Sequence, residues 1–223
     1  MLRVTFAGDE LADFTTASFD DHVKIFLPDA NGNIIARDYT PRRFDETTRE
    51  LDIEFTLHGD GPATRWAVRL KPGDVAAIGG PRSSHVIPID FDWYVLIADE
   101  TGLPALARRL EELPHSVPVF AIAMVDSEDD CVSLAVGKST HVTWIYRVKG
   151  EIISQLIDAL YRLQPSIGDG HAWAACEASM ARVLRDVLSM RLSLPKEWVK
   201  TAGYWRRGKA STHEVYGQIN REP

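Results

Sequence analysis

The sequence predicts two domains, an antiparallel β domain over residues 1–89 followed by an α/β domain with a parallel sheet over residues 90–223. Short runs separated by turn residues fill the first part, whereas near-continuous apolar runs alternate with helical patterns after Pro88. A chain of 223 residues also exceeds the commonest size of a single domain. Two domains of ordinary size therefore fit it better than one.

The first part contains strand-like runs bounded by turn residues, over residues 3–6, 22–27, 34–39, 51–57 and 74–78. Asn31-Gly32-Asn33 lies between the second and third runs and predicts a hairpin turn. One helix is expected over residues 64–70, with Thr64 as its N-cap, because Lys71-Pro72-Gly73 would end it. Together these elements predict an antiparallel sheet or barrel.

The second part alternates two kinds of pattern. Apolar runs predict strands over residues 93–98, 117–125, 132–136, 141–146 and 171–175. Amphipathic patterns predict helices over residues 103–113, 152–163 and 178–190. Buried strands separated by helices are typical of a parallel sheet covered on both faces.

Composition excludes several classes of protein. The chain is 45% hydrophobic and 26% charged, as in ordinary globular proteins. A net charge of -7 argues against a nucleic-acid binder, because affinity for phosphate backbones needs a basic balance. No apolar run approaches the roughly 18 residues of a membrane span, and residues 1–6 resemble a strand rather than a signal peptide. A cytoplasmic location without membrane contact is expected.

The cysteines and histidines suggest no catalytic or metal site. Cys131 and Cys176 belong to no Cys-x-x-Cys cluster, and both are expected to be reduced and buried. A buried core thiol is commoner than a reactive one, so Cys176 receives no nucleophilic role. The histidines lack metal-ligand spacing, and a Ser-His-Asp triad would be an arbitrary choice. We therefore assign no catalytic side chain and no metal ligand.

Residues 37–42 indicate a site for a phosphorylated, planar ligand. On an extended backbone Arg37 and Tyr39 project to one side, while Asp38 points away. Pro41 disfavours a helical Thr40 and so supports the extended interpretation. A cation for a phosphate, a ring for stacking and a hydroxyl group then lie close together.

A second candidate segment is the glycine-containing turn over residues 58–66. The start of the helix that follows it offers backbone amides and a positive dipole end, which suit a pyrophosphate. The alternative is a Gly-Pro turn with a Thr cap and no ligand. Its combination with Arg37, Tyr39 and Thr40 favours the ligand interpretation.

Two strand ends in the second part are further candidates, since open α/β sheets bind ligands at the carboxyl ends of their strands. Residues 99–104 follow the first parallel strand, with Thr101 as a helix cap and an early Pro104. Residues 173–179 form the second such junction. Each remains compatible with a simple capped helix, because the Gly-x-Gly-x-x-Gly fingerprint is absent.

Residues 203–209 carry two aromatic and three basic residues. They have two open interpretations, an amphipathic patch that anchors the last helix or an edge that receives an anionic partner.

Taken in order, these segments resemble the siderophore-interacting proteins, the flavin-dependent ferric-siderophore reductases of the wider ferredoxin-reductase group. The resemblance covers nearly the whole chain. The matching segments are residues 37–42, 58–66, 80–82, 99–105, 173–179 and 203–208.

The resemblance implies an FAD-binding barrel over residues 1–89 and an NAD(P)H-binding domain with a C-terminal extension over residues 90–223. Arg37 would contact the FAD phosphate, Tyr39 would lie against the isoalloxazine, and Thr40 would bond near its reactive edge. The implied reaction takes a hydride from NADPH or NADH to FAD and then delivers single electrons to ferric iron. The flavin carries the chemistry, so no catalytic side chain is required.

The resemblance also implies roles for other positions. The remaining FAD-binding residues would be Pro41, Arg42, His58, Gly61, Pro62, Ala63 and Thr64. The nicotinamide path would involve Asp99, Thr101, Ala175 and Glu177, and Arg147 would meet the adenosine phosphate of NADPH. Residues that could steer an anionic ferric siderophore are Arg206, Arg207 and Lys209, with Arg42 and Arg43 as alternatives.

Two departures from the family pattern keep other functions open. The family usually has a β-strand before the segment matched by residues 2–8, and Cys176 stands where it generally has glycine. The alternatives are a degenerate member that binds a siderophore or nucleotide without turnover and a general flavin or ferredoxin-linked reductase. The expected partners are a ferric siderophore and, as a further candidate, ferredoxin, and the chain is expected to be monomeric.

Overall fold

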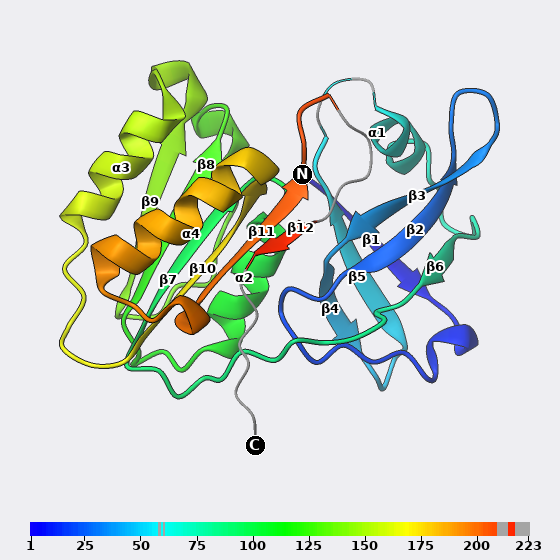
Figure 1. The fold of residues 1–223 in the computed structure, drawn as a ribbon. Helices are drawn as coiled ribbons and strands as arrows, with labels where there is room; N and C mark the ends of the chain where they lie inside the picture. Colours follow the sequence, from blue (N-terminus) through cyan, green and yellow to red (C-terminus); the bar gives the residue numbers. More distant parts are fainter. Residues whose placement is uncertain (58, 60, 209–213, 217–223) are drawn as a thin grey trace. The chain divides into compact units, whose positions relative to one another are not determined.

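The chain divides into two compact units, Met1–Ile87 and Pro88–Pro223, in a computed structural model that describes residues 1–57, 59, 61–208 and 214–216 (Figure 1). Each unit has its own core of buried apolar side chains.

The first unit contains two three-stranded antiparallel sheets (Figure 1). One has the order β1-β5-β4, formed by β1 (Leu2–Ala7), β5 (Glu50–Phe55) and β4 (Pro41–Asp45). The other has the order β3-β2-β6, formed by β3 (Ile34–Tyr39), β2 (Val23–Pro28) and β6 (Ala77–Gly79). A 3-10 turn spans Asp9–Leu11, and α1 spans Pro62–Ala67. Alternate residues of β2 and β5 form the core with Ala67, namely Val23, Ile25, Leu27, Leu51, Ile53 and Phe55.

The hairpin predicted at Asn31-Gly32-Asn33 is confirmed between β2 and β3. The Asp29 carboxylate accepts hydrogen bonds from the amides of Asn31 and Asn33, at 2.8 and 2.9 Å. Gly32 has a φ of +83°, in the left-handed region that glycine adopts without steric cost.

Two predictions in this unit were wrong. Strand β4 was missed because it begins with Pro41 and carries two arginines, but it lies at the edge of its sheet, where proline is tolerated. The helix begins at Pro62 rather than Thr64, because a proline at the first helical position leaves no backbone donor unsatisfied. Its N-cap is Gly61, which makes no side-chain cap, so the predicted Thr64 cap does not form.

The second unit contains one six-stranded sheet with the order β12-β11-β10-β7-β8-β9. Five strands are parallel and β12 is antiparallel. The strands are β7 (Trp93–Asp99), β8 (Val119–Val125), β9 (Thr140–Tyr146), β10 (Gly170–Glu177), β11 (Val199–Trp205) and β12 (Glu214–Tyr216). The helices are α2 (Leu103–Glu112), α3 (Ile152–Arg162) and α4 (Ala178–Leu192), with 3-10 turns at Glu128–Asp130, Arg147–Lys149 and Lys196–Trp198.

The helices cover both faces of this sheet, as predicted. Helices α3 and α4 lie on one face and α2 lies on the other (Figure 1). Strand residues Val95, Ile97 and Ala174 pack in one cluster with Leu156 of α3 and Leu184 of α4. The continuous burial of β7 from Trp93 to Asp99 explains its uninterrupted apolar sequence.

The predicted strand over residues 132–136 does not form. This segment connects β8 to β9, which are direct neighbours in the sheet, and the chain passes between them without adding a strand. Strands β11 and β12 were missed. Polar residues conceal β11 in the sequence, although Lys200 is only 6% exposed and Thr201 is fully buried.

Within the described residues, no helix has the length and apolar character that crossing a bilayer requires.

Candidate functional site

An aromatic cluster in the first unit brings two predicted ligand segments together. The Tyr39 ring of β3 lies 4.5 Å from the Phe55 ring of β5, measured between centroids. The Trp66 ring of α1 lies 5.9 Å from the same Phe55 ring. The strand that carries residues 37–39 and the helix that follows the glycine turn therefore pack on one shared ring, although Tyr39 and Gly61 are 22 positions apart along the chain.

Strand β3 orients its side chains as the alternating pattern predicts. Tyr39 and Arg37 stand opposite the buried Val23 and Ile25 of β2, so they share the core side of the strand. Asp38 points to the other side, where its carboxylate accepts a 2.6 Å hydrogen bond from Lys24 Nζ. An Arg37 Nη1 atom donates to the Ala36 carbonyl at 2.8 Å.

Tyr39 presents an uncharged aromatic ring. Burial raises the pKa of its hydroxyl group to about 12, and the nearby Arg37 only partly opposes that rise. The ring therefore stays neutral at physiological pH. A neutral ring beside a cation suits a planar group that is joined to a phosphate.

Thr40 and Arg42 are buried, whereas side chains that contact a ligand at the protein surface would be exposed. Thr40 is 6% exposed and Arg42 is 7% exposed. The Arg42 Nε atom lies 3.7 Å from a Glu54 carboxylate oxygen on β5. Arg42 therefore pairs within the fold, and its role toward a cofactor stays a prediction.

The start of α1 leaves room for an anion. A Cβ atom built on Gly61 would meet no heavy atom of the described residues within 4 Å. Among the residues that the structure describes, no side chain caps the helix, and the positive ends of its first amides lie at this turn. The space and the donors fit a pyrophosphate, so the residues present are compatible with FAD. His58, predicted for the same turn, lies outside the described residues.

Asp99 is a buried carboxylate at the carboxyl end of β7. Its carboxylate accepts hydrogen bonds from Thr101 N and Oγ1, at 3.0 and 2.6 Å, and from Trp205 Nε1 at 2.7 Å. The prediction that Thr101 caps α2 was wrong, because Gly102 occupies the N-cap position. Burial, with a smaller contribution from Glu100, raises the pKa of Asp99 to about 6.

Arg147 ties together three neighbouring strand ends. Its guanidinium donates to Glu100, after β7, at 2.7 and 2.9 Å, and to Asp126, after β8, at 2.8 Å. The cation is therefore matched by two carboxylates in this structure. Its predicted contact with an adenosine phosphate would have to compete with them, and it stays a prediction.

The end of β10 is engaged with the helix that follows it. Ala175 and Cys176 are fully buried, and the Glu177 carboxylate caps α4 by accepting from the amides of Ser179 and Met180, at 2.7 and 3.3 Å. Burial alone would raise the pKa of Glu177, but these hydrogen bonds hold it below its ordinary value.

Cys176 belongs to the core cluster, as predicted, so its side chain points into the protein. Burial, then Asp99 and Glu177, raise the pKa of its thiol. Cys131 is only partly buried, so the prediction that both cysteines are buried was wrong for Cys131. Its loop follows a 3-10 turn at the surface instead of forming the predicted strand.

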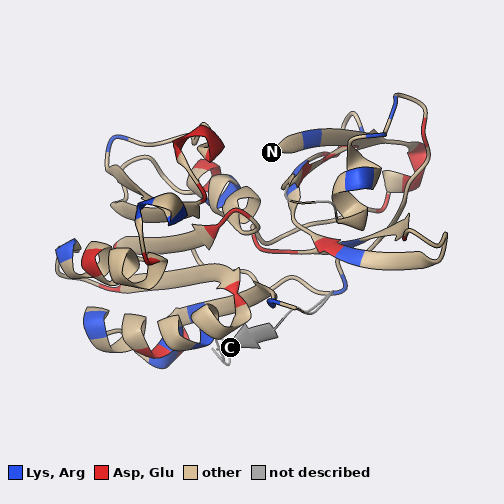
Figure 2. Cartoon of the chain, turned by 90° about the horizontal axis from the view of Figure 1, so that it is seen from above, with Lys and Arg blue, Asp and Glu red and all other residues tan. Residues whose placement is uncertain are grey.

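The basic C-terminal segment continues strand β11 rather than a helix. Arg207 is exposed, and its backbone amide donates to Glu177 Oε1 at 3.4 Å. Arg206 is partly buried, and Lys209 lies outside the described residues. Helix α4 carries three arginines and one aspartate, Arg182, Arg185, Asp186 and Arg191, and Figure 2 shows how basic and acidic residues are distributed over the chain.

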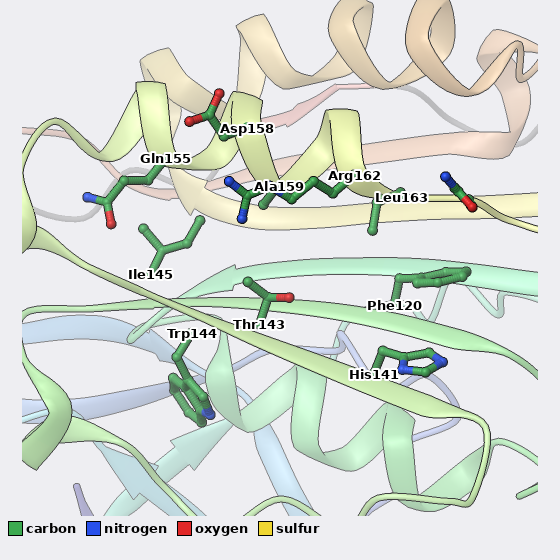
Figure 3. Close-up of a pocket in the computed structure, with 11 residues that line it drawn as sticks. Phe120, His141, Thr143, Trp144, Ile145, Gln155, Asp158, Ala159, Arg162 and Leu163 are labelled. Carbon is green, nitrogen blue, oxygen red and sulfur yellow. The ribbon is translucent and has the colours of Figure 1, made fainter.

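A cavity of about 480 Å³ lies between α3 and β9 in the second unit, and none of the predicted site residues is among those that line it (Figure 3). Gln155, Asp158 and Arg162 of α3 line it on one side, and His141 and Thr143 of β9 line it on the other. Sequence reasoning did not predict this cavity, because its lining residues form no recognisable motif.

Sequence reasoning missed two residues that organise the candidate site. Phe55 links Tyr39 to Trp66, and Trp205 holds Asp99. Phe55 gave no signal beyond its place in an apolar strand. Trp205 lay within a noted aromatic and basic segment, but that segment offered no indication of its partner.

Comparison with known proteins places this geometry in a family. The model of the siderophore-interacting FAD-binding domain matches residues 1–36 and 31–85, and the model of the siderophore-interacting protein matches residues 91–208. The NADPH-dependent ferric-chelate reductase of Escherichia coli is 31% identical over 91% of this chain and 86% of its own length. The ferric vibriobactin reductase ViuB of Vibrio cholerae is 25% identical over 94% and 85%.

Solved structures agree with the observed fold. A siderophore utilization protein from T. fusca superimposes with a TM-score of 0.84 and 34% identity, over 93% of this chain and 87% of that one. Ferredoxin-NADP+ reductase from Plasmodium falciparum shares the fold alone, with a TM-score of 0.63, 14% identity and coverage of 88% and 87%. The ferredoxin-reductase-like fold predicted from the sequence is thus confirmed, and the chain belongs to the siderophore-interacting protein family.

Proposed function

We propose that this chain is a flavin-dependent reductase that passes electrons from NADPH or NADH through FAD to ferric siderophores. The observation that carries the proposal is the shared packing of Tyr39 and α1 on Phe55, which brings the ring proposed to stack on FAD near the turn proposed to hold its pyrophosphate. The names of the two curated relatives, a ferric-chelate reductase and a ferric vibriobactin reductase, support the substrate class.

The first unit supplies the FAD contacts in this proposal. Arg37 neutralises a phosphate, Tyr39 lies against the isoalloxazine, and Thr40 bonds near its reactive edge. The pyrophosphate rests on the turn before α1, formed by Gly61, Pro62, Ala63 and Thr64, with His58 completing it. Pro41 keeps the strand extended, and Arg42 supports it through its contact with Glu54.

Bound at this site, FAD would supply the redox chemistry, namely hydride acceptance from the nicotinamide and one-electron transfer to ferric iron. The chain's own residues set the surroundings for that chemistry. Tyr39 adds no charge beside the ring because its hydroxyl group stays protonated. Reduction of the iron weakens its hold by the siderophore, because oxygen-rich chelators bind ferric iron better than ferrous iron.

The second unit receives the nicotinamide nucleotide in this proposal. Asp99, Thr101, Ala175 and Glu177 line its path, and Arg147 meets the adenosine phosphate. NADPH is favoured as the donor by the name of the Escherichia coli relative. Arg206, Arg207 and Lys209 steer the anionic ferric siderophore. We further propose that the chain acts as a monomer in the cytoplasm, with ferredoxin as an alternative electron donor.

Substitution of Arg37 tests the proposed FAD site. Arg37→Ala should lower the ratio of FAD to protein after purification, because one phosphate loses its charged partner. Arg43→Ala is a matched control, since the Arg43 side chain is 63% exposed and pairs only with Asp45 among the ion pairs of the described residues. Flavin absorbance per chain measures both. Equal flavin content in all three proteins would reject the phosphate role of Arg37.

Gly61→Ala distinguishes an effect on FAD binding from an effect on folding. The added methyl group meets open space, and Gly61 has a φ of -69°, which alanine adopts readily. Folding should therefore be unaffected, whereas a pyrophosphate lying against this turn would meet the new methyl group. Reduced FAD binding with an unchanged melting temperature of the flavin-free protein is expected.

A degenerate binding protein remains the rival function. Cys176 in place of the family's glycine was one reason for this alternative. That reason is weakened, because the Cys176 side chain is buried in the core instead of lying on the surface. Oxidation of NADPH that accelerates when a ferric siderophore is added would favour the reductase. Equal acceleration by unrelated electron acceptors would favour a general flavin reductase.

A further inference from the structure

Asp99 and Trp205 form a bond that spans a neighbouring strand. Asp99 ends β7 and Trp205 ends β11, and β10 lies between these two strands in the sheet. The 2.7 Å hydrogen bond from Trp205 Nε1 to Asp99 Oδ2 therefore crosses the carboxyl end of β10. Adjacent strands are about 4.8 Å apart, so the bond spans about 10 Å between strands and requires a long side chain such as that of Trp205.

The ends of these strands are packed without spare space. A Cβ atom on Gly102, at the start of α2, would lie 2.7 Å from the Ala175 carbonyl oxygen. A Cβ atom on Gly203 would lie 2.7 Å from Ala178 Cα, at the start of α4. Both helix starts thus press against the region that the bond crosses. The bond therefore ties together a rigid frame instead of two mobile loops.

A second carboxylate fixes the residues that follow Trp205. Glu177 pairs with Trp205 in the strand register, and its Oε1 atom accepts from the backbone amide of Arg207 at 3.4 Å. Trp205 and Arg207 are thus held from two sides, one by Asp99 and the other by Glu177. Arg206 lies between them.

We propose that Asp99 is a positioning residue, which acts through Trp205 to hold the Arg206 and Arg207 backbone beside the end of β10 that receives the nicotinamide nucleotide. This inference rests on the proposed function of the second unit. It adds a positioning role for Trp205 to the siderophore steering already proposed for Arg206 and Arg207.

The hydrogen bonds favour the ionised form of Asp99, because three donors meet its two oxygens. Burial opposes that form and raises the pKa of Asp99 to about 6. Among the described residues, two ionisable groups interact electrostatically with Asp99. Glu100, which pairs with Arg147, raises the pKa of Asp99, and Asp99 in turn raises the pKa of Cys176. The pKa of the Cys176 thiol is raised by burial, so the thiol stays neutral.

Acidification should therefore weaken the bond from Trp205 to Asp99 while Glu177 stays ionised. The pKa of Glu177 lies below its ordinary value, because hydrogen bonds outweigh its burial. As the pH falls from 7.5 to 5, protonation of Asp99 would weaken its bond with Trp205, whereas the bond between the Arg207 amide and Glu177 would persist. Nucleotide affinity should depend on pH through Asp99.

The first experiment observes the bond without any catalysis. Indole N–H signals of protein labelled with ¹⁵N-tryptophan are recorded from pH 5 to pH 8, and Trp205→Phe identifies the Trp205 signal. That signal should shift with a midpoint near pH 6 and should not titrate in Asp99→Asn. A Trp205 signal that does not change over this range would overturn the proposal.

The second experiment measures NADP⁺ affinity by calorimetry on the FAD-loaded protein. The 2′-phosphate itself titrates near pH 6, so wild type and variants are compared at each pH. Trp205→Phe should bind NADP⁺ at least about tenfold more weakly than wild type at pH 7.5, as expected for loss of a hydrogen bond to a charged group. At pH 5 the two proteins should differ by less than about twofold, because wild type has lost most of that bond.

Asp186→Asn serves as a matched control, since Asp186 lies on the exposed side of α4 and its carboxylate is 68% exposed. It should bind NADP⁺ as wild type does at both pH values. A constant difference between Trp205→Phe and wild type, or no NADP⁺ binding by wild type, would overturn the positioning role. If ferric siderophores are not reduced but the affinity difference still depends on pH, the proposed function fails and this inference stands.

Discussion

Replacement of Asp99 by asparagine should stabilise the protein at neutral pH. Asp99 is 2% exposed, and its pKa is about 6 instead of the ordinary 3.8. The folded protein therefore binds this proton more tightly than the unfolded chain does. Stability of the wild type should fall as pH rises from about 4 through 6, because the buried carboxyl group loses its proton.

The size of the effect follows from the pKa. A difference between 3.8 and about 6 corresponds to about 3 kcal/mol of lost stability at pH 7, at 1.36 kcal/mol for each pH unit. At pH 4 the same relation gives a loss of stability of less than about 1 kcal/mol. Asparagine carries no charge, but its amide group fits the three donors less well, which costs about 1–2 kcal/mol at every pH.

Thermal unfolding of wild type and Asp99→Asn from pH 4 to pH 8 measures the effect. The variant should gain about 2 kcal/mol relative to wild type between pH 4 and pH 7, a relative rise in melting temperature of about 4–8 °C. Asp186→Asn should show no such trend, because Asp186 is exposed. A difference between Asp99→Asn and wild type that does not change with pH would refute the reasoning, and a stable variant with weak NADP⁺ binding would show that the charge serves function.

Two further predictions concern the packing of the second unit. In the folded protein a thiol reagent should modify Cys131 and spare Cys176, because Cys176 is fully buried and burial raises the pKa of its thiol; mass spectrometry after labelling distinguishes them, and equal modification would contradict the structure. Gly102→Ala should lower stability by about 1–3 kcal/mol in denaturant unfolding, because its methyl group would meet Ala175 at 2.7 Å, whereas Gly61→Ala should not; equal stability of both variants would count against this close packing.

The fold was largely predictable because its strongest patterns are local. Strand β7 is apolar at nearly every position and buried on both faces, and the Asn31-Gly32-Asn33 turn specifies its hairpin without distant contacts. Strand β11 was missed because its burial depends on neighbours that the sequence does not show. Lys200 and Thr201 look like surface residues, yet both are buried.

The candidate site was predictable where one segment carries it and less so where distant segments meet. The orientation of Arg37, Asp38 and Tyr39 follows from alternation along a single strand. The pairing of Asp99 with Trp205 joins residues 106 positions apart, and no local pattern announces it. Arg147 looked available for a phosphate in the sequence, whereas in the structure its charge is matched by two carboxylates.

Anaerobic reduction of the FAD-loaded protein tests the central proposal most directly. NADPH should bleach the flavin absorbance, and a ferric siderophore added afterwards should restore it while ferrous iron appears in a chelator assay. An iron-free siderophore is the control and should leave the flavin reduced. A protein that cannot be loaded with FAD, or a reduced flavin that a ferric siderophore does not reoxidise, would contradict the proposal.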